Sequence, residues 1–255
     1  MDNTEIMPIH DFHSERLFVD APLGAGKAVE CTSQQAHYLL NVLRLKSRDT
    51  ILVFNGRDGE WKATLRDTAR RRCRMIVEEQ TRAQESGPDI SYLFAPLKRS
   101  RLDYMVQKAT ELGAAHLHPV FTRRTIAGRV NLERMRANVI EAAEQCGILT
   151  IPEVAEPVPL ARLLESWDKT RRIVFCDEAA EIADPLASLA RLAPGPFALL
   201  VGPEGGFAPN ERESLLAYEF VTAISLGPRI MRADTAAVAA LTLLNAVHGD
   251  WKGDV

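Results

Sequence analysis

This chain of 255 residues lacks the features that mark several large classes of protein. No apolar run approaches the roughly 20 residues that a membrane-spanning helix needs. Cysteine is scarce, and its four positions form no CxxC pair and have no histidine at metal-site spacing. These are Cys31, Cys73, Cys146 and Cys176. We therefore expect reduced packing thiols in a cytoplasmic protein, with no metal and no membrane association.

Signal and nucleotide-binding motifs are also lacking. Residues 1–15 carry four acidic residues and no basic segment before an apolar one, so they are not a secretory signal, and we expect a polar extension of little functional weight. The segment 202–207, GPEGGF, is neither the GxGxxG of a dinucleotide-binding βαβ unit nor a P-loop. This argues against a nucleotide-dependent dehydrogenase, which fold alone would allow.

What is present is an ordinary globular composition with an uneven distribution of charge. Apolar residues make up 46% and charged residues 25% of the chain, and the net charge is −3. Residues 16–85 carry +4 and residues 86–140 carry +5, whereas residues 141–255 carry −8. Basic residues thus concentrate in the first part of the chain and acidic residues in the last. This distribution suits a protein that binds a phosphate backbone with one face, although a solvated surface with local bias explains it about equally well.

The first part of the chain, residues 16–85, has a mostly strand-like pattern. Short β-prone runs are separated by turn residues, as between Gly56 and Gly59, and one helix begins near Ser33. These runs cover residues 16–19, 28–32, 50–55, 61–65 and 73–77. Five short strands and one helix predict a small β-barrel, and residues 86–89 then read as a linker.

The second part, residues 88–255, alternates near-continuous apolar runs with helical stripes. The runs cover residues 90–95, 117–121, 172–176, 197–201 and 221–226. One helix should end at Gly113, and another should begin at Asn131 and end at Gly147. The alternation predicts a mostly parallel α/β sheet.

Two loops near the C-terminus read as halves of one site. The first loop covers residues 202–207 (GPEGGF) and the second covers residues 226–236 (LGPRIMRADTA). Each loop follows an apolar run and leads into a helix-like segment. In the second loop, Asp234 or Thr235 can cap that helix. A ligand at the carboxyl ends of parallel strands meets such loops first, and glycines let backbone groups approach it. Asp177 and Glu178, at the end of another run, are candidates for a third loop facing the same ligand.

The paired loops closely resemble those of the SPOUT (α/β-knot) RNA methyltransferases, and specifically the RsmE family, which methylates N3 of a uridine in 16S ribosomal RNA. Residues 37–45 (HYLLNVLRL) and the block 107–113 (QKATELG) add weaker similarity. The resemblance implies an N-terminal PUA-like RNA-binding β-barrel, followed by a SPOUT domain with a C-terminal trefoil knot. It also implies a homodimer that acts on small-subunit ribosomal RNA or the assembled small subunit.

The resemblance further implies S-adenosylmethionine as methyl donor, bound largely by backbone groups of the two loops. The cofactor residues carried over by position are Leu200, Gly202, Glu204, Gly205, Leu226, Gly227, Ile230, Met231 and Arg232. Uridine N3 must lose a proton, so a base or a cation near the uracil oxygens is needed. The candidate catalytic residues are Arg232, which is favoured as anion stabiliser, and Glu204, the nearest carboxylate of the motif, which is favoured as a hydrogen-bonding or structural group over the base. Which group removes the N3 proton stays open at this point.

The sequence departs from the family where many relatives continue EQxxR. Here Glu144 and Gln145 are followed by Cys146, Gly147 and Ile148, so that arginine is missing. The expected RNA contacts are the cations Arg16, Arg70, Arg71, Arg72, Arg123 and Arg124, the last two as replacements for the missing arginine. Alternatives are a SPOUT enzyme acting on a ribose 2′-hydroxyl or another base, and a non-catalytic ribosome-assembly factor.

Overall fold

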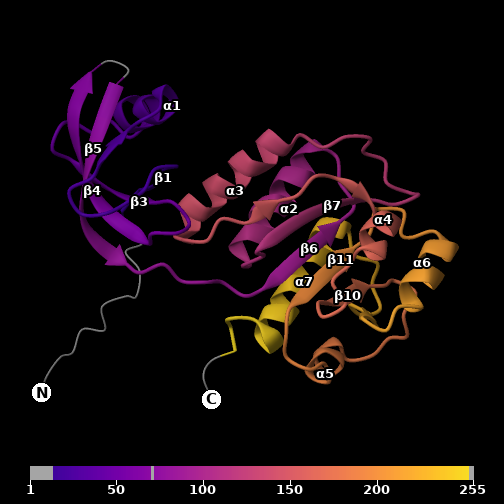
Figure 1. The fold of residues 1–255 in the computed structure, drawn as a ribbon. Helices are drawn as coiled ribbons and strands as arrows, with labels where there is room; N and C mark the ends of the chain where they lie inside the picture. Colours follow the sequence, from indigo (N-terminus) through magenta and orange to yellow (C-terminus); the bar gives the residue numbers. More distant parts are fainter. Residues whose placement is uncertain (1–13, 70–71, 253–255) are drawn as a thin grey trace, which may run out of the picture. The chain divides into compact units, whose positions relative to one another are not determined.

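The computed structural model describes residues 14–69 and 72–252, which form two compact units (Figure 1). The first unit contains the chain up to Ser86 together with Ala143–Ile151, and the second contains Gly87–Ala142 and Pro152–Val255. The sequence predicted a single domain boundary, between residues 85 and 88. It did not predict that residues 143–151 belong to the first unit. The polar extension expected at residues 1–15 lies almost wholly outside the described residues.

The first unit is a five-stranded sheet with one helix. Its strands are β1 (Arg16–Phe18), β2 (Ala28–Glu30), β3 (Thr50–Phe54), β4 (Glu60–Ala69) and β5 (Arg72–Arg82), in the order β1-β3-β4-β5-β2. Strand β1 is parallel to β3, and the other pairs are antiparallel. All five strands that the sequence predicted are confirmed. Helix α1 (Ser33–His37) continues into the π-helical turn η1 (Tyr38–Val42).

The cap of α1 differs by one residue from the expectation. Thr32, not Ser33, is the N-cap: its side chain accepts a hydrogen bond from the Gln35 N–H at 3.2 Å. The Gln35 side chain in turn accepts from the Thr32 N–H at 2.8 Å. This reciprocal capping box satisfies two N–H groups at once, which a cap at Ser33 would not do.

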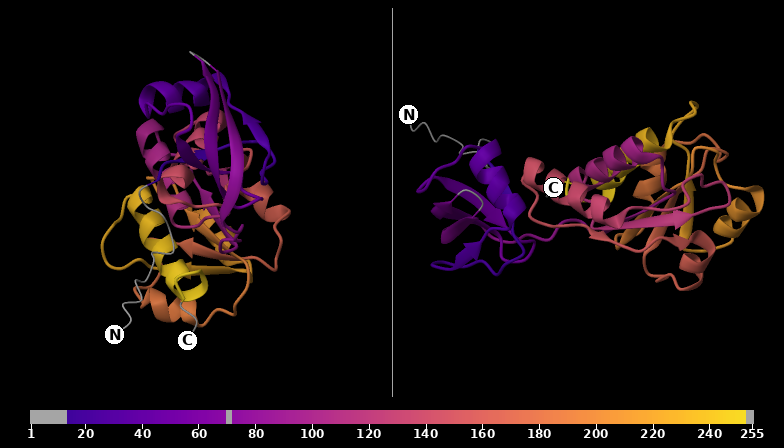
Figure 2. Two further views of the ribbon diagram at one scale, coloured as in Figure 1. Left: turned by 90° about the vertical axis from the view of Figure 1, so that its left-hand side faces the viewer. Right: turned by 90° about the horizontal axis from the view of Figure 1, so that it is seen from above.

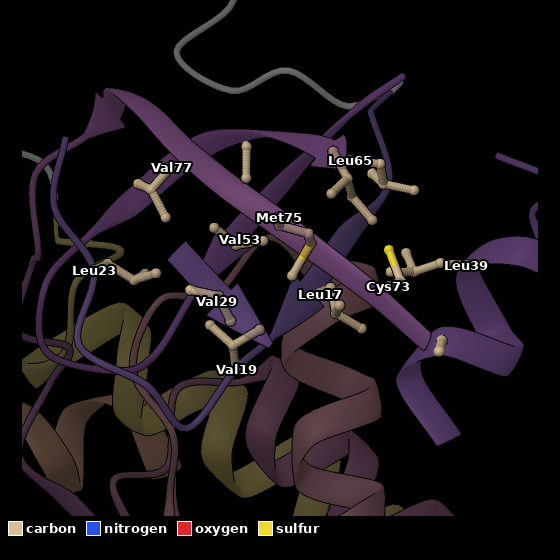
Figure 3. Packing of buried hydrophobic residues seen from close by; sticks show 13 residues of the cluster. Leu17, Val19, Leu23, Val29, Leu39, Val53, Leu65, Cys73, Met75 and Val77 are labelled. Carbon is tan, nitrogen blue, oxygen red and sulfur yellow. The ribbon is translucent and has the colours of Figure 1, made fainter. Parts of the chain in front are cut away.

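The core of the first unit lies between the sheet and the helical segment (Figure 3). On β5 the inward positions alternate, so that Cys73, Met75 and Val77 are buried and the residues between them are not. Leu39 from η1 closes the same cluster. A second cluster joins Phe54 to Ala143 and Leu149, with Ile148 packed against it, and this apolar contact explains why residues 143–151 belong to the first unit.

The second unit is built on an all-parallel sheet. Its strands are β6 (Ile90–Phe94), β7 (His116–Phe121), β8 (Glu153–Val154), β9 (Val158–Pro159), β10 (Arg172–Cys176), β11 (Phe197–Val201) and β12 (Val221–Ile224). The order is β12-β10-β11-β6-β7-β8, with β9 pairing β7. The five longer strands were predicted, whereas the two-residue strands β8 and β9 carry too short a pattern to be read from sequence.

Helices cover both faces of this sheet (Figures 1 and 2). They are α2 (Arg99–Glu111), α3 (Leu132–Cys146, whose last turn belongs to the first unit), α4 (Leu160–Glu165), α5 (Pro185–Ala190), α6 (Pro209–Leu216) and α7 (Ala233–His248). On one face, leucines of α4 and α6 pack against Phe175 and Leu200. On the other, α7 packs against α2, α5 and β11. A parallel sheet buried on both faces explains the near-continuous apolar runs.

The predicted helix boundaries at Gly113, Asn131 and Gly147 are confirmed. Asn131 caps α3 by accepting from the Arg134 N–H at 3.0 Å. Gly113 and Gly147 follow α2 and α3 with φ of +74° and +64°, the left-handed conformation that ends helices. None of the four cysteines forms a disulfide, and Cys146 is exposed and so is not the packing residue expected. In the part of the chain that the structure describes, no helix has the length and apolarity to cross a bilayer.

Candidate functional site

A cavity of about 650 Å³ opens at the carboxyl ends of β10, β11 and β12. These three strands are neighbours in the sheet, so the segments that follow them meet at one place. Residues after each strand line the cavity: Asp177 after β10, Gly202 after β11 and Ser225 after β12. This is the edge at which open α/β sheets bind ligands, and the volume is that of a small-molecule site.

The loop after β11 owes its shape to two glycines. A Cβ atom at Gly202 would lie 2.3 Å from Cε2 of Phe207, whose ring packs edge-on against Phe175 with centroids 5.0 Å apart. At Gly206, φ is +66°, and a Cβ would lie 2.2 Å from a carboxylate oxygen of Glu178. Side chains at these positions would therefore push Phe207 or Glu178 out of place, and the loop would lose its path along the cavity.

Glu204 in this loop is held by a cation that the sequence reading did not single out. Its carboxylate is hydrogen-bonded and ion-paired with the guanidinium of Arg101, in the first turn of α2. Arg101 Nε also lies 3.9 Å from Asp234 at the start of α7. Arg101 thus connects the loop after β11 to the helix that follows the second loop, and all three side chains are only partly exposed.

The loop after β12 leaves open space for a ligand. Gly227 has φ of +99°, and nothing lies within 4 Å of where its Cβ would be. Its N–H donates to the Ser225 hydroxyl at 3.3 Å, which fixes the turn. Ile230, further along, is 93% exposed. The loop ends at Arg232, which is the N-cap of α7 and lies on the cavity wall.

The expectation that Asp234 or Thr235 caps this last helix is wrong. Helix α7 begins at Ala233, one residue before Asp234, and its N-cap Arg232 makes no side-chain capping bond. The Asp234 carboxylate instead accepts from the Thr235 N–H at 3.0 Å and faces Arg101. An acidic side chain in the first turn still interacts favourably with the helix dipole, so the helix start is stabilised without a capping bond.

The third wall of the cavity follows β10. The Asp177 carboxylate is buried and accepts from Arg212 Nε at 2.9 Å, and this bond raises the pKa of Arg212 above its ordinary value. Glu178 is exposed and lines the cavity, as does Ile182. Burial raises the pKa of the neighbouring Cys176 thiol to about 12, so this cysteine stays protonated and is no nucleophile at neutral pH.

A fourth segment, after β7, supports the first loop. Arg124 lines the cavity and its Nη1 donates to the Gly205 carbonyl at 2.8 Å. The backbone N–H of Arg123 donates to Glu211 at 2.8 Å, while the Arg123 side chain is exposed. The two arginines therefore divide their roles: Arg124 contacts the cavity loop, and Arg123 presents its charge to solvent.

Most of the cofactor residues expected from the sequence line this cavity. They are Gly202, Glu204, Leu226, Gly227, Ile230, Met231 and Arg232. Leu200 and Gly205 do not line it. The Leu200 side chain is fully buried among the residues that pack under α4 and α6. A Cβ at Gly205 would make only ordinary 3.8 Å contacts with Arg124.

Arg16, expected to contact RNA, is buried instead. Its side chain is 5% exposed, and its Nε donates to Glu60, itself 2% exposed, at 2.8 Å. Gly147 lies against the same guanidinium, since a Cβ there would be 3.3 Å from Arg16 Nε. These contacts give Arg16 a structural role, and we leave it out of the RNA surface. Arg70 and Arg71 lie outside the described residues, and Arg72 is exposed.

Arg101 and Arg212 are the site residues that sequence reasoning missed. Neither lies in a glycine-bearing loop, and each reaches the cavity from a helix: Arg101 from α2 and Arg212 from α6. A lone arginine in a polar helical segment has no local sequence pattern that would mark it as a ligand-site residue. For the described residues, no group of three or more His, Cys, Asp and Glu side chains could hold a metal ion.

Comparison with known proteins gives consistent matches along the chain. Residues 84–245 match the sequence model of the RNA methyltransferase domain, and residues 32–78 match that of the RNA methyltransferase PUA domain. The chain is 31% identical over 228 residues to ribosomal RNA small subunit methyltransferase E of Rickettsia conorii, covering 89% of this chain and 93% of the relative. It is 32% identical to the same-named protein of Synechocystis, covering 86% and 73%.

Solved structures agree with the sequence matches. The crystal structure of ribosomal RNA small subunit methyltransferase E from Neisseria gonorrhoeae, bound to S-adenosyl methionine, superposes with a TM-score of 0.83 at 27% identity. The match covers 94% of this chain and all of that one. Both units of this chain therefore have counterparts in one solved relative, the first as a PUA-like domain and the second as an α/β methyltransferase domain.

Proposed function

Because the chain belongs to the ribosomal RNA small subunit methyltransferase E family, we propose that it transfers a methyl group from S-adenosylmethionine to small-subunit ribosomal RNA. The observation that carries the proposal is the cavity formed by the loops after β10, β11 and β12. The named relatives and the cofactor-bound neighbour support the same assignment.

The residues of the cavity fit this cofactor. Val201, Leu226 and Met231 offer apolar surface of the kind that an adenine ring needs. The space beside Gly227 lets a ligand approach the backbone directly. Glu178 is a carboxylate for the cationic end of the molecule, and Arg229 is a cation for its carboxylate. When bound, the cofactor supplies an activated methyl group on a sulfonium.

The finer proposal is that the methyl acceptor is N3 of a uridine. That nitrogen carries a proton at neutral pH, so negative charge develops on the uracil oxygens as the proton leaves. Arg232 is exposed, lines the cavity and stands at the positive N-terminal end of α7. We assign it to stabilise that charge. Its forked N–H groups suit a planar carbonyl acceptor better than an ammonium would.

Glu204 is assigned a positioning role. Its carboxylate is already engaged by Arg101, and a base that must accept a proton needs a free lone pair directed at the substrate. We therefore infer that Glu204 holds the loop after β11 in place through Arg101.

The remaining assignments concern partners. We infer that Arg123, Arg124 and Arg72 contact RNA, since the side chains of all three are exposed in basic stretches of the chain. We also infer a homodimer. Ile230 is 93% exposed in the cavity loop, and a second copy covering it would remove a large apolar side chain from water. A sedimentation experiment on wild type and Ile230→Asp tests this, with a monomeric wild type contradicting it.

Methyl transfer is tested with small ribosomal subunits from a strain that lacks the gene. Purified protein and labelled S-adenosylmethionine should transfer about one methyl group per subunit, and mass spectrometry of nuclease digests should identify 3-methyluridine. A product methylated on a ribose hydroxyl or another base would retain the methyltransferase assignment and overturn the N3 assignment. Binding of cofactor and RNA without turnover would favour a non-catalytic assembly factor.

A further inference from the structure

The segment that joins η1 to β3, residues 43–49, carries three exposed cations: Arg44, Lys46 and Arg48. We propose that this segment, the 43–49 loop, is a docking site for the phosphate backbone of RNA. The proposal rests on the function proposed above, since it names the surface by which the first unit holds that substrate. Three features of the loop carry it: rigid anchoring, backbone strain at two of the cations, and unpaired charge.

The 43–49 loop is anchored at both ends and in its middle. Leu43 and Leu45 pack against the core of the first unit, so the residues between and after them are turned toward solvent. The Leu45 N–H donates to the Leu39 carbonyl at 2.9 Å, and the Arg48 N–H donates to the Leu65 carbonyl at 2.9 Å. Because the backbone is already held in place, a cation in this loop loses little conformational freedom when it binds RNA. A lower entropy cost of binding favours a specific contact.

Two of the cations stand in a backbone conformation that ordinary residues avoid. Arg44 has φ of +59° and Arg48 has φ of +79°. Glycine adopts this conformation without strain, and asparagine tolerates it better than arginine does. Strain of this kind is concentrated at functional sites, where a particular side chain is needed despite its cost. Arg44 directly follows the C-cap residue of η1, where left-handed residues are common, so the strain points to a functional guanidinium chiefly at Arg48.

The charge of the loop is also left unneutralised. Among the described residues, no carboxylate forms an ion pair with Arg44, Lys46 or Arg48. Several other cations of the same unit are paired, namely Arg57 with Asp20, Lys62 with Glu79 and Arg74 with Asp67.

Asp49 is the one acidic residue of the loop. Its carboxylate accepts a hydrogen bond from the Lys46 backbone N–H at 2.8 Å, so it stabilises the turn. No Asp or Glu occurs from residue 31 to residue 48. Exposed Arg66 directly follows Leu65 on β4, whose carbonyl Arg48 contacts, and it extends the positive surface. Closely spaced unpaired cations attract a polyanion and release its counterions on binding, which fits the phosphate backbone of RNA.

The test uses the full chain and deproteinised small-subunit ribosomal RNA from a strain that lacks the gene. Dissociation constants are measured between about 50 and 300 mM salt. We expect Arg44→Gln/Lys46→Gln/Arg48→Gln to weaken binding and to reduce the slope of log affinity against log salt by about two to three, one per lost phosphate contact. Affinity for S-adenosylmethionine, measured by calorimetry, should stay at the wild-type value.

Two further variants keep the test decisive. Arg57→Gln removes a cation that is paired with Asp20 and that follows the far end of β3, so its salt slope should equal that of wild type. Arg44→Gly/Arg48→Gly should be at least as stable to heat as wild type, because glycine relieves the strain, and should still lower the slope by about two.

A wild-type slope in the triple and double-glycine variants would overturn the docking site. So would an equal loss of slope in Arg57→Gln, because the effect would then be one of net charge. Failure of the wild type to bind S-adenosylmethionine or to methylate small subunits is a separate result, and it would overturn the proposed function instead.

Discussion

The Glu204 carboxylate, in the loop after β11, is bonded to the guanidinium of Arg101 in the first turn of α2. The two residues are far apart in the chain, and their contact joins the cavity loop to α2. Both side chains are partly exposed, so the ion pair adds little to global stability, at most about 1 kcal/mol. Its consequence should instead be local: the position of the loop that contains Gly202.

We expect Arg101→Ala and Glu204→Gln each to lower affinity for S-adenosylmethionine severalfold while the melting temperature changes little. Because each removes the same contact, the double variant should bind about as well as either single variant. Isothermal calorimetry on the four proteins measures the coupling. Fully additive losses would mean that Arg101 and Glu204 contact the cofactor independently.

Gly227 and Gly205 provide a matched pair of glycines in the two loops. Gly227→Val would place a side chain in the open space of the cavity and should lower cofactor affinity by at least about tenfold. Gly205→Val should have a smaller effect, since Gly205 does not line the cavity and its Cβ would make only 3.8 Å contacts with Arg124. Circular dichroism serves as the folding control, because Val at φ of +99° is also strained. Equal affinities in the two variants would contradict the placement of the cavity.

Arg232→Lys separates catalysis from cofactor binding. If the guanidinium stabilises the uracil anion, turnover should fall about tenfold to a thousandfold, the range for loss of one preorganised donor. Single-turnover rates at saturating cofactor and RNA, together with separate affinity measurements, decide the matter. A deficit found wholly in cofactor affinity would make Arg232 a cofactor ligand and remove it from the chemistry.

Arg16 and Glu60 form a buried ion pair in the first unit, with side chains 5% and 2% exposed. Arg16→Met leaves Glu60 without its closest cation, since Arg82 lies 3.9 Å away, and should cost about 3 to 5 kcal/mol of unfolding free energy. Arg16→Met/Glu60→Leu should recover much of that loss. Denaturant titration measures both. A stable Arg16→Met that binds RNA poorly would instead restore Arg16 as an RNA contact.

Local pattern was enough to determine much of this protein. The apolar runs predicted five strands in each part of the chain. A strand buried on both faces is apolar along its whole length, and a strand buried on one face is apolar at alternate residues, so both patterns are visible in the sequence. The two glycine-bearing loops predicted a ligand site, since their position after strands and their glycines are local properties. Seven of the nine expected cofactor residues line the cavity for this reason.

The tertiary structure alone decided which distant residues serve these loops. Arg101, Arg124 and Arg212 reach the cavity from segments whose own sequence carries no glycine motif. Leu200 faces away because the pleat of β11 alternates, and only the packing of α4 and α6 shows which face is which.

The position of Arg16 was likewise beyond the sequence. From sequence, an arginine at the start of a strand is expected to be exposed. In the structure, Glu60, 44 residues later, and the returning segment 143–151 lie against Arg16 and bury it. Periodicity records which face of an element is apolar. It does not record which other element will cover that face, because such contacts join residues that are remote along the chain.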